Sequence, residues 1–287
     1  MNKLPAERRT AIVRALVEGN SVRGTGRLTG TAKGTILRLV ADLGDACARL
    51  HDQMVRDIKA THLQADEIWS FCHAKARNVP DARKGESGLG DLWTWVCLDA
   101  DTKLAISYLV GQRDSGEATQ FMFDLVSRLA GRVQLTTDGF PGYLRAVEEA
   151  FGWNNVDYAM LVKIYGSGHE IDRGYSPPVC VGAEKHWVMG KPDAAHVSTS
   201  FVERSNLTMR MQMRRFTRLT NAFSKKAENH AHAVALHFAY YNFCRPHTTL
   251  TKAAKGVYRT PAMAAGLTDH VWTVADLVAL LDEKVAA

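Results

Sequence analysis

The sequence predicts an α/β protein in which a mixed β-sheet is flanked by helices and preceded by an all-helical N-terminal segment. Two observations support this prediction. The first 62 residues show helical periodicity interrupted by glycine-containing turns. From residue 63 onward, runs rich in β-branched and aromatic residues alternate with helical runs. With 287 residues and an apolar fraction of 46%, the chain is large enough for a substantial core.

The N-terminal segment is expected to form three short helices, over residues 5–18, 21–28 and 32–43. Thr31 is the predicted cap of the third helix, and Gly44 is its predicted end. Residues after this glycine, up to about position 62, are expected to form a connecting helix.

Three short helices with a tight glycine turn before the last are typical of a helix-turn-helix, whose final helix lies in the major groove of DNA. In this interpretation Lys33, Thr35 and Arg38 would face bases or phosphates. A small bundle used for dimerisation is the alternative that the pattern leaves open.

The middle of the chain predicts three antiparallel strands, then a helix, a strand, a helix and a strand. This order is expected of a ribonuclease-H-like α/β sheet. The predicted strands are 63–75, 91–100, 102–113, 132–139 and 157–166, and the predicted helices are 115–129 and 142–152.

An insertion and two long helices are expected to follow the sheet. Residues 166–198 contain Gly, Pro and a possible short hairpin around "KHWVMGK", so they are interpreted as an insertion. The two helices are predicted over about 199–219 and 221–244, and Pro246 stops the second one.

Charge is distributed unevenly along the chain, whose net charge is +6. Residues 1–62 carry eleven Lys or Arg against six Asp or Glu, and residues 199–260 carry eleven against two. Residues 63–198 are acidic instead, with thirteen against eighteen. Two basic blocks around an acidic middle indicate a polyanion as partner, and nucleic acid is the obvious candidate. A solvated basic surface without a ligand is the alternative.

Several classes of protein are not expected from the composition. The five cysteines are scattered and contain no C-x-x-C pair, which argues against a disulfide framework and a zinc ribbon. No apolar run approaches the ~20 residues that cross a bilayer, and the N-terminus lacks the features of a secretory signal. A cytoplasmic location with no membrane partner is therefore expected.

Three acids in distant segments are candidate ligands for divalent metal ions. Asp66 lies in the middle of a predicted strand, Asp138 ends another at the edge where α/β sheets place ligands, and Glu203 lies on the helix after the insertion. Each acid also has a purely structural interpretation. Asp66 would be an edge-strand charge, Asp138 part of a turn, and Glu203 part of a capping box with Ser200. Strand alternation leaves open whether Asp66 or the adjacent Glu67 points inward, or whether both contribute.

Converging carboxylates are what metal-dependent phosphodiester chemistry requires. An anionic phosphate resists nucleophilic attack, and two divalent ions ~3.5–4 Å apart overcome this by stabilising the attacking and leaving oxygens. Mg²⁺ prefers oxygen ligands, which a few carboxylates supply. Three acids on strand, strand and helix therefore fit one site better than three unrelated roles.

The acidic segments "ADEIWSF", "TTDGFPGY" and "FVERSNLTMR" resemble the three acidic blocks of DDE transposases, most closely those of the insertion sequence 1 type. The segments "ALHFAYYNFCRPHTTL" and "RTPAMAAGLTDHVWTVADLV" resemble the tyrosine-rich helix end and the C-terminal tail of such proteins. The resemblance spans about residues 6–281. Unlike some relatives, the chain has no N-terminal cysteine-rich zinc motif.

The resemblance implies a DNA transposase that binds the terminal inverted repeats of an insertion element and catalyses metal-dependent DNA cleavage and strand transfer. Asp66, Asp138 and Glu203 match the metal-binding triad, which implies two Mg²⁺ ions, with Mn²⁺ as an alternative. Double-stranded DNA, both terminal repeats and target, is the implied partner, and a homo-oligomer on DNA is expected. A DNA-binding regulator with an inactive nuclease-like domain, or a nuclease without joining activity, are the alternatives.

Helical spacing places Glu203, Asn206, Arg210 and Arg214 on one stripe, with apolar residues opposite. Arg210 matches the basic residue that contacts DNA in many such enzymes, and Arg204 and Arg214 are further candidate DNA contacts. The expected apolar residues are Val202, Met209, Met213 and Phe216. The predicted domains are 1–62 with the helix-turn-helix, 63–250 with the ribonuclease-H-like fold, and a 251–287 tail.

Overall fold

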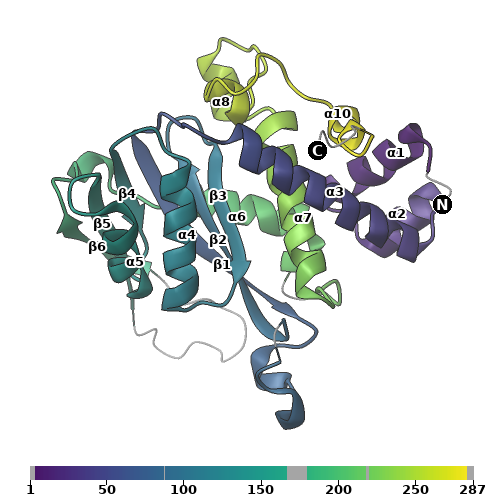
Figure 1. Ribbon diagram of the computed structural model, residues 1–287, viewed down its shortest axis with the longest axis horizontal. Helices are drawn as coiled ribbons and strands as arrows, with labels where there is room; N and C mark the ends of the chain where they lie inside the picture. The colour runs from purple at the N-terminus through teal and green to yellow at the C-terminus, as the bar shows by residue number, and fades with distance from the viewer. Residues whose placement is uncertain (1–3, 87, 167–179, 218–219, 283–287) are drawn as a thin grey trace.

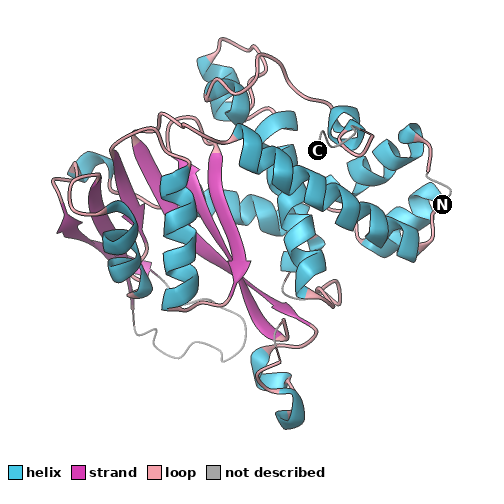
Figure 2. Ribbon diagram, in the orientation of Figure 1, coloured by secondary structure: helices cyan, strands magenta, loops and turns pink. Residues whose placement is uncertain are grey.

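The computed structural model describes residues 4–86, 88–166, 180–217 and 220–282. A six-stranded mixed sheet with helices on both faces occupies the centre of this described part (Figures 1 and 2). The strands lie in the order β3-β2-β1-β4-β5-β6. Their bounds are β1 His62–Cys72, β2 Gly90–Asp99, β3 Ala105–Gly111, β4 Val133–Thr137, β5 Val156–Tyr165 and β6 Cys180–Met189.

Strand directions follow the connections between them. β1, β2 and β3 are antiparallel neighbours, whereas β4 pairs parallel with both β1 and β5. This mixed sheet with flanking helices is consistent with a ribonuclease-H-like α/β fold, and the predicted order of elements is confirmed. Part of the predicted insertion belongs to the sheet, because β6 pairs antiparallel with β5. Residues 167–179 of that insertion lie outside the described residues.

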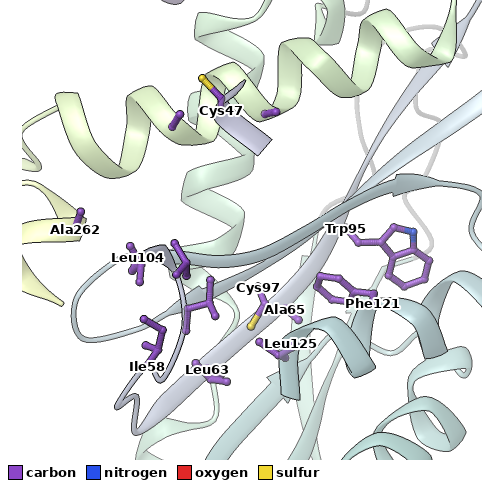
Figure 3. Packing of buried hydrophobic residues seen from close by; sticks show 14 of the residues in the cluster. Cys47, Ile58, Leu63, Ala65, Trp95, Cys97, Leu104, Phe121, Leu125 and Ala262 are labelled. Carbon is purple, nitrogen blue, oxygen red and sulfur yellow. The ribbon is translucent and has the colours of Figure 1, made fainter. Parts of the chain in front are cut away.

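Each face of the sheet is covered by two helices. On one face lie α4 (Ser115–Ser127) and α5 (Gly142–Phe151), and on the other lie α6 (Ser200–Gln212) and α7 (Ala227–Ala239). Alternation along β1 separates the two sides. Figure 3 shows Leu63 and Ala65 of β1 near Phe121 and Leu125 of α4, whereas Ile68 belongs to a second cluster with Val202 and Phe238.

The helices after β6 are shorter than the sequence predicts. α6 ends at Gln212, because Met213 adopts an extended backbone (φ −115°, ψ 104°), and a 3-10 turn, η4 (Arg214–Phe216), follows. α7 begins at Ala227, not near residue 221. Met209, Met213 and Phe216 are nevertheless buried as predicted, because the turn continues the apolar side of α6.

The N-terminal part contains three helices, α1 (Ala6–Val17), α2 (Val22–Thr29) and α3 (Lys33–Met54). Thr31 does not cap α3 as expected, since Ala32 occupies that position and the Thr31 hydroxyl instead accepts a hydrogen bond from Arg8 Nε (3.2 Å). Gly30 closes α2 in the left-handed conformation (φ 60°) that glycine adopts without strain.

Gly44 does not end a helix, because α3 continues ten residues beyond it to Met54. The glycine lies where α3 crosses α7. A Cβ atom built on Gly44 would overlap His232 Cβ and lie 2.6 Å from His232 Cα, closer than side chains can approach. The glycine therefore permits close packing between an N-terminal and a C-terminal helix, and α1, α3 and the sheet share one hydrophobic cluster.

The C-terminal segment returns to the N-terminus. After a π-helical turn, η5 (Tyr240–Cys244), come α8 (Thr248–Ala253), α9 (Pro261–Ala264) and α10 (Val274–Ala279). α10 packs against α1, and the buried Arg9 donates to Asp282 at 2.6 Å (Figure 1). The domain boundaries predicted at residues 62 and 250 stay predictions. None of the described helices combines the length and apolarity that a membrane span requires.

Substituting Gly44→Ala should destabilise the protein, because the added methyl group forces α3 away from α7. We expect a loss of about 2 kcal/mol or more in the free energy of unfolding, measured by urea denaturation. Gly34→Ala on the same helix is the matched control, since a Cβ there meets nothing within 4 Å. It should be neutral or stabilising by up to ~1 kcal/mol. Equal stabilities for the two variants would contradict the close crossing.

Candidate active site

The pairing of β1 with β4 brings two of the predicted acids together. The parallel ladder ends with Ala65 opposite Thr137, so Asp66 and Asp138 are the next residues on neighbouring strands. β4 stops at this point, whereas β1 continues to Cys72. Asp138 is fixed in place because its Oδ1 accepts a hydrogen bond from the Phe140 backbone N–H at 3.0 Å.

Glu67 is a third carboxylate at the same place. Oxygen atoms of Asp66, Glu67 and Asp138 lie within 4.8 Å of one another. The Glu67 side chain is only 1% exposed, whereas that of Asp138 is 33% exposed. Of the two adjacent acids on β1, whose roles the sequence left open, Asp66 is the more accessible and Glu67 lies beneath the site.

A cation that the sequence analysis did not identify lies beside these acids. Arg113, in the loop between β3 and α4, reaches Asp138 Oδ2 at 3.2 Å and Glu67 Oε2 at 3.4 Å with the same nitrogen, Nη2. Its guanidinium carbon lies 4.3 Å from the centre of the Phe140 ring and 5.0 Å from that of Trp93. These rings hold the guanidinium against the carboxylates by cation–π attraction.

Glu203 approaches from the helix on the other side. Its Oε2 accepts a hydrogen bond from Lys163 Nζ on β5, and its Oε1 accepts one from Thr199 Oγ1, both at 2.5 Å. The predicted capping box with Ser200 is wrong, because Thr199 is the N-cap and the Ser200 hydroxyl bonds to Ser198 instead. The Glu203 side chain is 37% exposed, so it is accessible to a ligand.

Asn206 connects α6 to the acid on β1. Its side-chain Nδ2 donates to Asp66 Oδ2 at 2.8 Å. Val202 and Met209 lie buried on the opposite side of the helix, which is the arrangement that helical spacing predicted. α6 therefore presents polar groups to the acids while its apolar side packs on the sheet.

A cleft of about 560 Å³ contains all of these groups. Its walls come from β1, the β4–α5 loop, β5 and α6. Its charged and amide side chains are Asp66, Glu67, Asp138, Glu203, Arg113, Lys163, Arg210 and Asn206.

Burial and mutual repulsion perturb the acids. Burial, followed by the charge of Asp138, raises the pKa of Asp66 to about 6 and that of Glu67 to about 8. Burial also raises the pKa of Asp138. Crowded, poorly solvated carboxylates are stabilised by a divalent cation, and an all-oxygen donor set fits Mg²⁺ or Mn²⁺.

Among the predicted site residues, the structure brings Asp66, Asp138, Glu203 and Arg210 to one cleft. The other predicted DNA contacts lie elsewhere. On α3, Lys33 and Arg38 are exposed and Thr35 is half-buried, whereas Arg204 is exposed on α6 and Arg214 is exposed on η4 rather than on the predicted helix.

The sequence analysis missed Arg113 and Lys163. Both are single cations in segments otherwise explained by strand and loop patterns, so no spacing identified them. Glu67 was recognised only as an alternative to Asp66. Lys163 could have been identified by a weak signal, since it lies on β5, the strand next to β4, and Asp138 directly follows β4.

Comparisons with known proteins add little to this geometry. No protein-family model matches the sequence, and neither does any curated protein. One solved structure with similarity to the chain is the crystal structure of a pre-cleavage Mos1 transpososome, at 14% sequence identity and a TM-score of 0.24. The match covers 55% of this chain and 60% of that chain, less than two thirds of the neighbour's length. A likeness this slight carries no argument, so the interpretation of the site depends on its own geometry.

Replacing Glu67 should change how stability depends on pH in metal-free buffer. A carboxyl group whose pKa rises on folding, here from 4.5 to about 8, binds its proton more tightly in the folded state. That stabilising contribution is fully present below pH 4.5 and is lost as the pH rises through 8. Between pH 5 and 9, Glu67→Gln should therefore gain about 4 kcal/mol in free energy of unfolding relative to wild type.

Urea denaturation in EDTA at both pH values measures this difference. Glu148→Gln, which alters an exposed acid on α5, should follow the wild-type pH dependence. A constant difference between Glu67→Gln and wild type at the two pH values would contradict the raised pKa of Glu67.

Asn206→Leu should weaken binding of Mn²⁺ about tenfold or more, because the lost amide both orients the Asp66 carboxylate and favours its charged form. Isothermal titration calorimetry of the metal alone measures this effect. Asn155→Leu removes a comparable half-buried hydrogen bond, to Phe151 O, away from the cleft and serves as control. Unchanged Mn²⁺ affinity in Asn206→Leu would show that Asp66 is not a ligand.

Proposed function

We propose that this chain is a DDE-type DNA transposase of the insertion sequence 1 type, which binds terminal inverted repeats and catalyses DNA cleavage and strand transfer. One observation supports this most strongly. Asp66 on β1, Asp138 after β4 and Glu203 on α6, separated by up to 137 positions in the chain, line one cleft together with three cations. The sequence resemblance of the three acidic segments adds the reaction type.

Asp66, Asp138 and Glu203 would hold two Mg²⁺ ions, with Mn²⁺ as an alternative. When bound, such ions lower the pKa of an attacking water or hydroxyl group and stabilise the leaving oxygen. Glu67 is almost completely buried and paired with Arg113, so its role would be to support Asp138 rather than to bind metal. Asn206 keeps the Asp66 carboxylate oriented toward the cleft.

The cations of the cleft would bind the substrate backbone. Arg210 lies on the same side of α6 as Glu203, and Lys163 reaches over from β5. Both are placed to contact phosphate oxygens next to the acids, where charge-assisted hydrogen bonds are strong. Arg113 would stay with Glu67 and Asp138, since four contacts fix its guanidinium: these two acids and the rings of Phe140 and Trp93.

Terminal-repeat recognition would belong to the N-terminal helices. This proposal is supported by the succession of α2, a tight turn at Gly30 and α3 along the chain, and by the exposure of Lys33 and Arg38 on α3. Thr35 would contribute at the edge of that surface. Exposed Arg204 and Arg214 would add backbone contacts that position the DNA without reading its sequence.

Strand transfer requires two element ends and a target duplex at once, so we further propose that the chain acts as a homo-oligomer on double-stranded DNA in the cytoplasm. A regulator that binds DNA through an inactive nuclease-like domain is a competing function. The accessible acids of the cleft count against it. A nuclease that cuts but never joins is the second competitor.

Purified protein should nick and join a duplex carrying the element's terminal repeat in Mg²⁺ and not in EDTA. Asp66→Asn, Asp138→Asn and Glu203→Gln should each lower joined product by at least about 100-fold, because a lost ligand misplaces the reacting groups. All three should still shift the duplex in a gel. Glu228→Gln, an exposed acid on α7, is the control and should remain active.

Binding without cutting by the wild type would favour the regulator. Nicked product that is never joined would favour the nuclease.

A further inference from the structure

Several aromatic side chains gather on the β1–β2 hairpin. Trp69 and Phe71 project from one face of β1 with ring centres 5.7 Å apart, and Phe71 lies 4.8 Å from Phe223 in the segment before α7. Trp93 on β2 is directly opposite Trp69 in the strand register. We call Phe223, Phe71, Trp69 and Trp93, together with Phe140 at the cleft end, the aromatic strip.

Most of the aromatic strip is not part of the core. The two hydrophobic clusters formed by the described residues include neither Trp69, Phe71, Trp93 nor Phe223. All four side chains are half-buried. The outer ends of β1 and β2 extend beyond the end of α4 (Figure 1). Trp93 supports Arg113, whereas Trp69, Phe71 and Phe223 contact one another outside the core.

Cations lie over four of the five rings of the strip, the exception in the described part of the chain being Phe71. Lys225 Nζ is 3.8 Å from the centre of the Phe223 ring, and Lys75 Nζ is 5.8 Å from that of Trp69. At the cleft end, Arg113 lies over both Trp93 and Phe140. Rings alternating with cations are the combination that binds single-stranded nucleic acid, since bases stack on the rings and phosphates pair with the cations.

Acids of the described residues neutralise one of these cations, since Arg113 pairs with Glu67 and Asp138, but not the two lysines. In the loop between β1 and β2, Asp81 pairs with Lys84 and Glu86 pairs with Arg83. The ion pairs of the described residues include neither Lys75 nor Lys225. Lys75 and Lys225 therefore place positive charge beside Trp69 and Phe223, and one acid, Asp91, lies opposite Phe71 in the strand register. Cations beside aromatic rings match a polyanion better than an apolar protein surface.

The strip leads into the candidate active site. Arg113 and Phe140 belong to both, since they line the cleft and Arg113 contacts Asp138 at 3.2 Å. Arg113 and Phe140 therefore connect the strip to the acids of the cleft.

We propose that the aromatic strip binds an unpaired DNA strand as it leaves the candidate active site. The proposal rests on the proposed function in taking DNA as the substrate. Unpaired bases are required because a duplex hides its base faces inside the stack, whereas the strip offers ring faces. The alternative is that the cations only shield the rings from water.

Fluorescence anisotropy with a labelled 20-nucleotide oligo-dT in EDTA tests the proposal without cleavage. Trp69→Ala and Phe71→Ala should each weaken binding about 5- to 100-fold, as expected for loss of one stacked base. Trp69→Phe should restore most of the affinity, which separates stacking from misfolding. Lys75→Ala should reduce the salt dependence, lowering the slope of log K against log salt by about 0.7.

Trp153→Ala is the matched control, because Trp153 is 67% exposed in the α5–β5 loop, outside the strip. It should bind oligo-dT as the wild type does. Equal affinity of Trp69→Ala, Phe71→Ala and wild type would overturn the proposal, as would an equal loss in Trp153→Ala.

The same proteins assayed on a terminal-repeat duplex in Mg²⁺ separate this proposal from the proposed function. If the wild type cuts and joins the duplex but the strip variants bind oligo-dT normally, only the proposed role of the aromatic strip is refuted. Strip variants that lose oligo-dT binding, with a wild type that never cuts, would refute the transposase function and leave the strip supported.

Discussion

The parallel pairing of β1 with β4 is the constraint on which the candidate site depends. Because the ladder closes at Ala65 and Thr137, the residues that follow must place two carboxylates side by side. Loss of this register by one residue would turn Asp66 to the opposite face and away from Asn206. By packing on both faces of the sheet, the flanking helices therefore also help to hold the β1–β4 register on which the site depends.

Repulsion between the acids is balanced by neighbours from every adjacent element. Arg113 comes from the loop after β3, Lys163 from β5, and Asn206 from α6. Each holds a different carboxylate, so the acids keep a defined arrangement although burial and neighbouring charge raise the pKa of Asp66 and Glu67. Crowding buried carboxylates in this way lowers the stability of the folded protein. Carboxylates with raised pKa values are typical of functional sites.

Local patterns predicted the elements of the sheet well, because strand periods and turn residues act over short distances. The position of Asp138 also followed from sequence, since a strand end at a sheet edge is a local feature. Arg113 could not be predicted in the same way. Its role arises from a loop that returns over Phe140 and Trp93, and only the folded chain shows that contact.

Helix boundaries failed for identifiable physical reasons. Gly44 was taken as a helix end, but its missing side chain serves a helix crossing and not a chain reversal. The apolar spacing of Met209, Met213 and Phe216 predicted one long helix, whereas a 3-10 turn preserves the same buried face after α6 has ended. The spacing of apolar residues therefore predicts which side of a helix is buried more reliably than it predicts the residue at which the helix ends.

The contact between α10 and α1 has a consequence for biosynthesis. The ribosome synthesises α1 long before residues 274–282. Arg9 therefore cannot pair with Asp282 until almost all of the chain has been made. During elongation the N-terminal helices lack part of their packing surface. Truncated products of incomplete translation would therefore carry poorly assembled N-terminal helices.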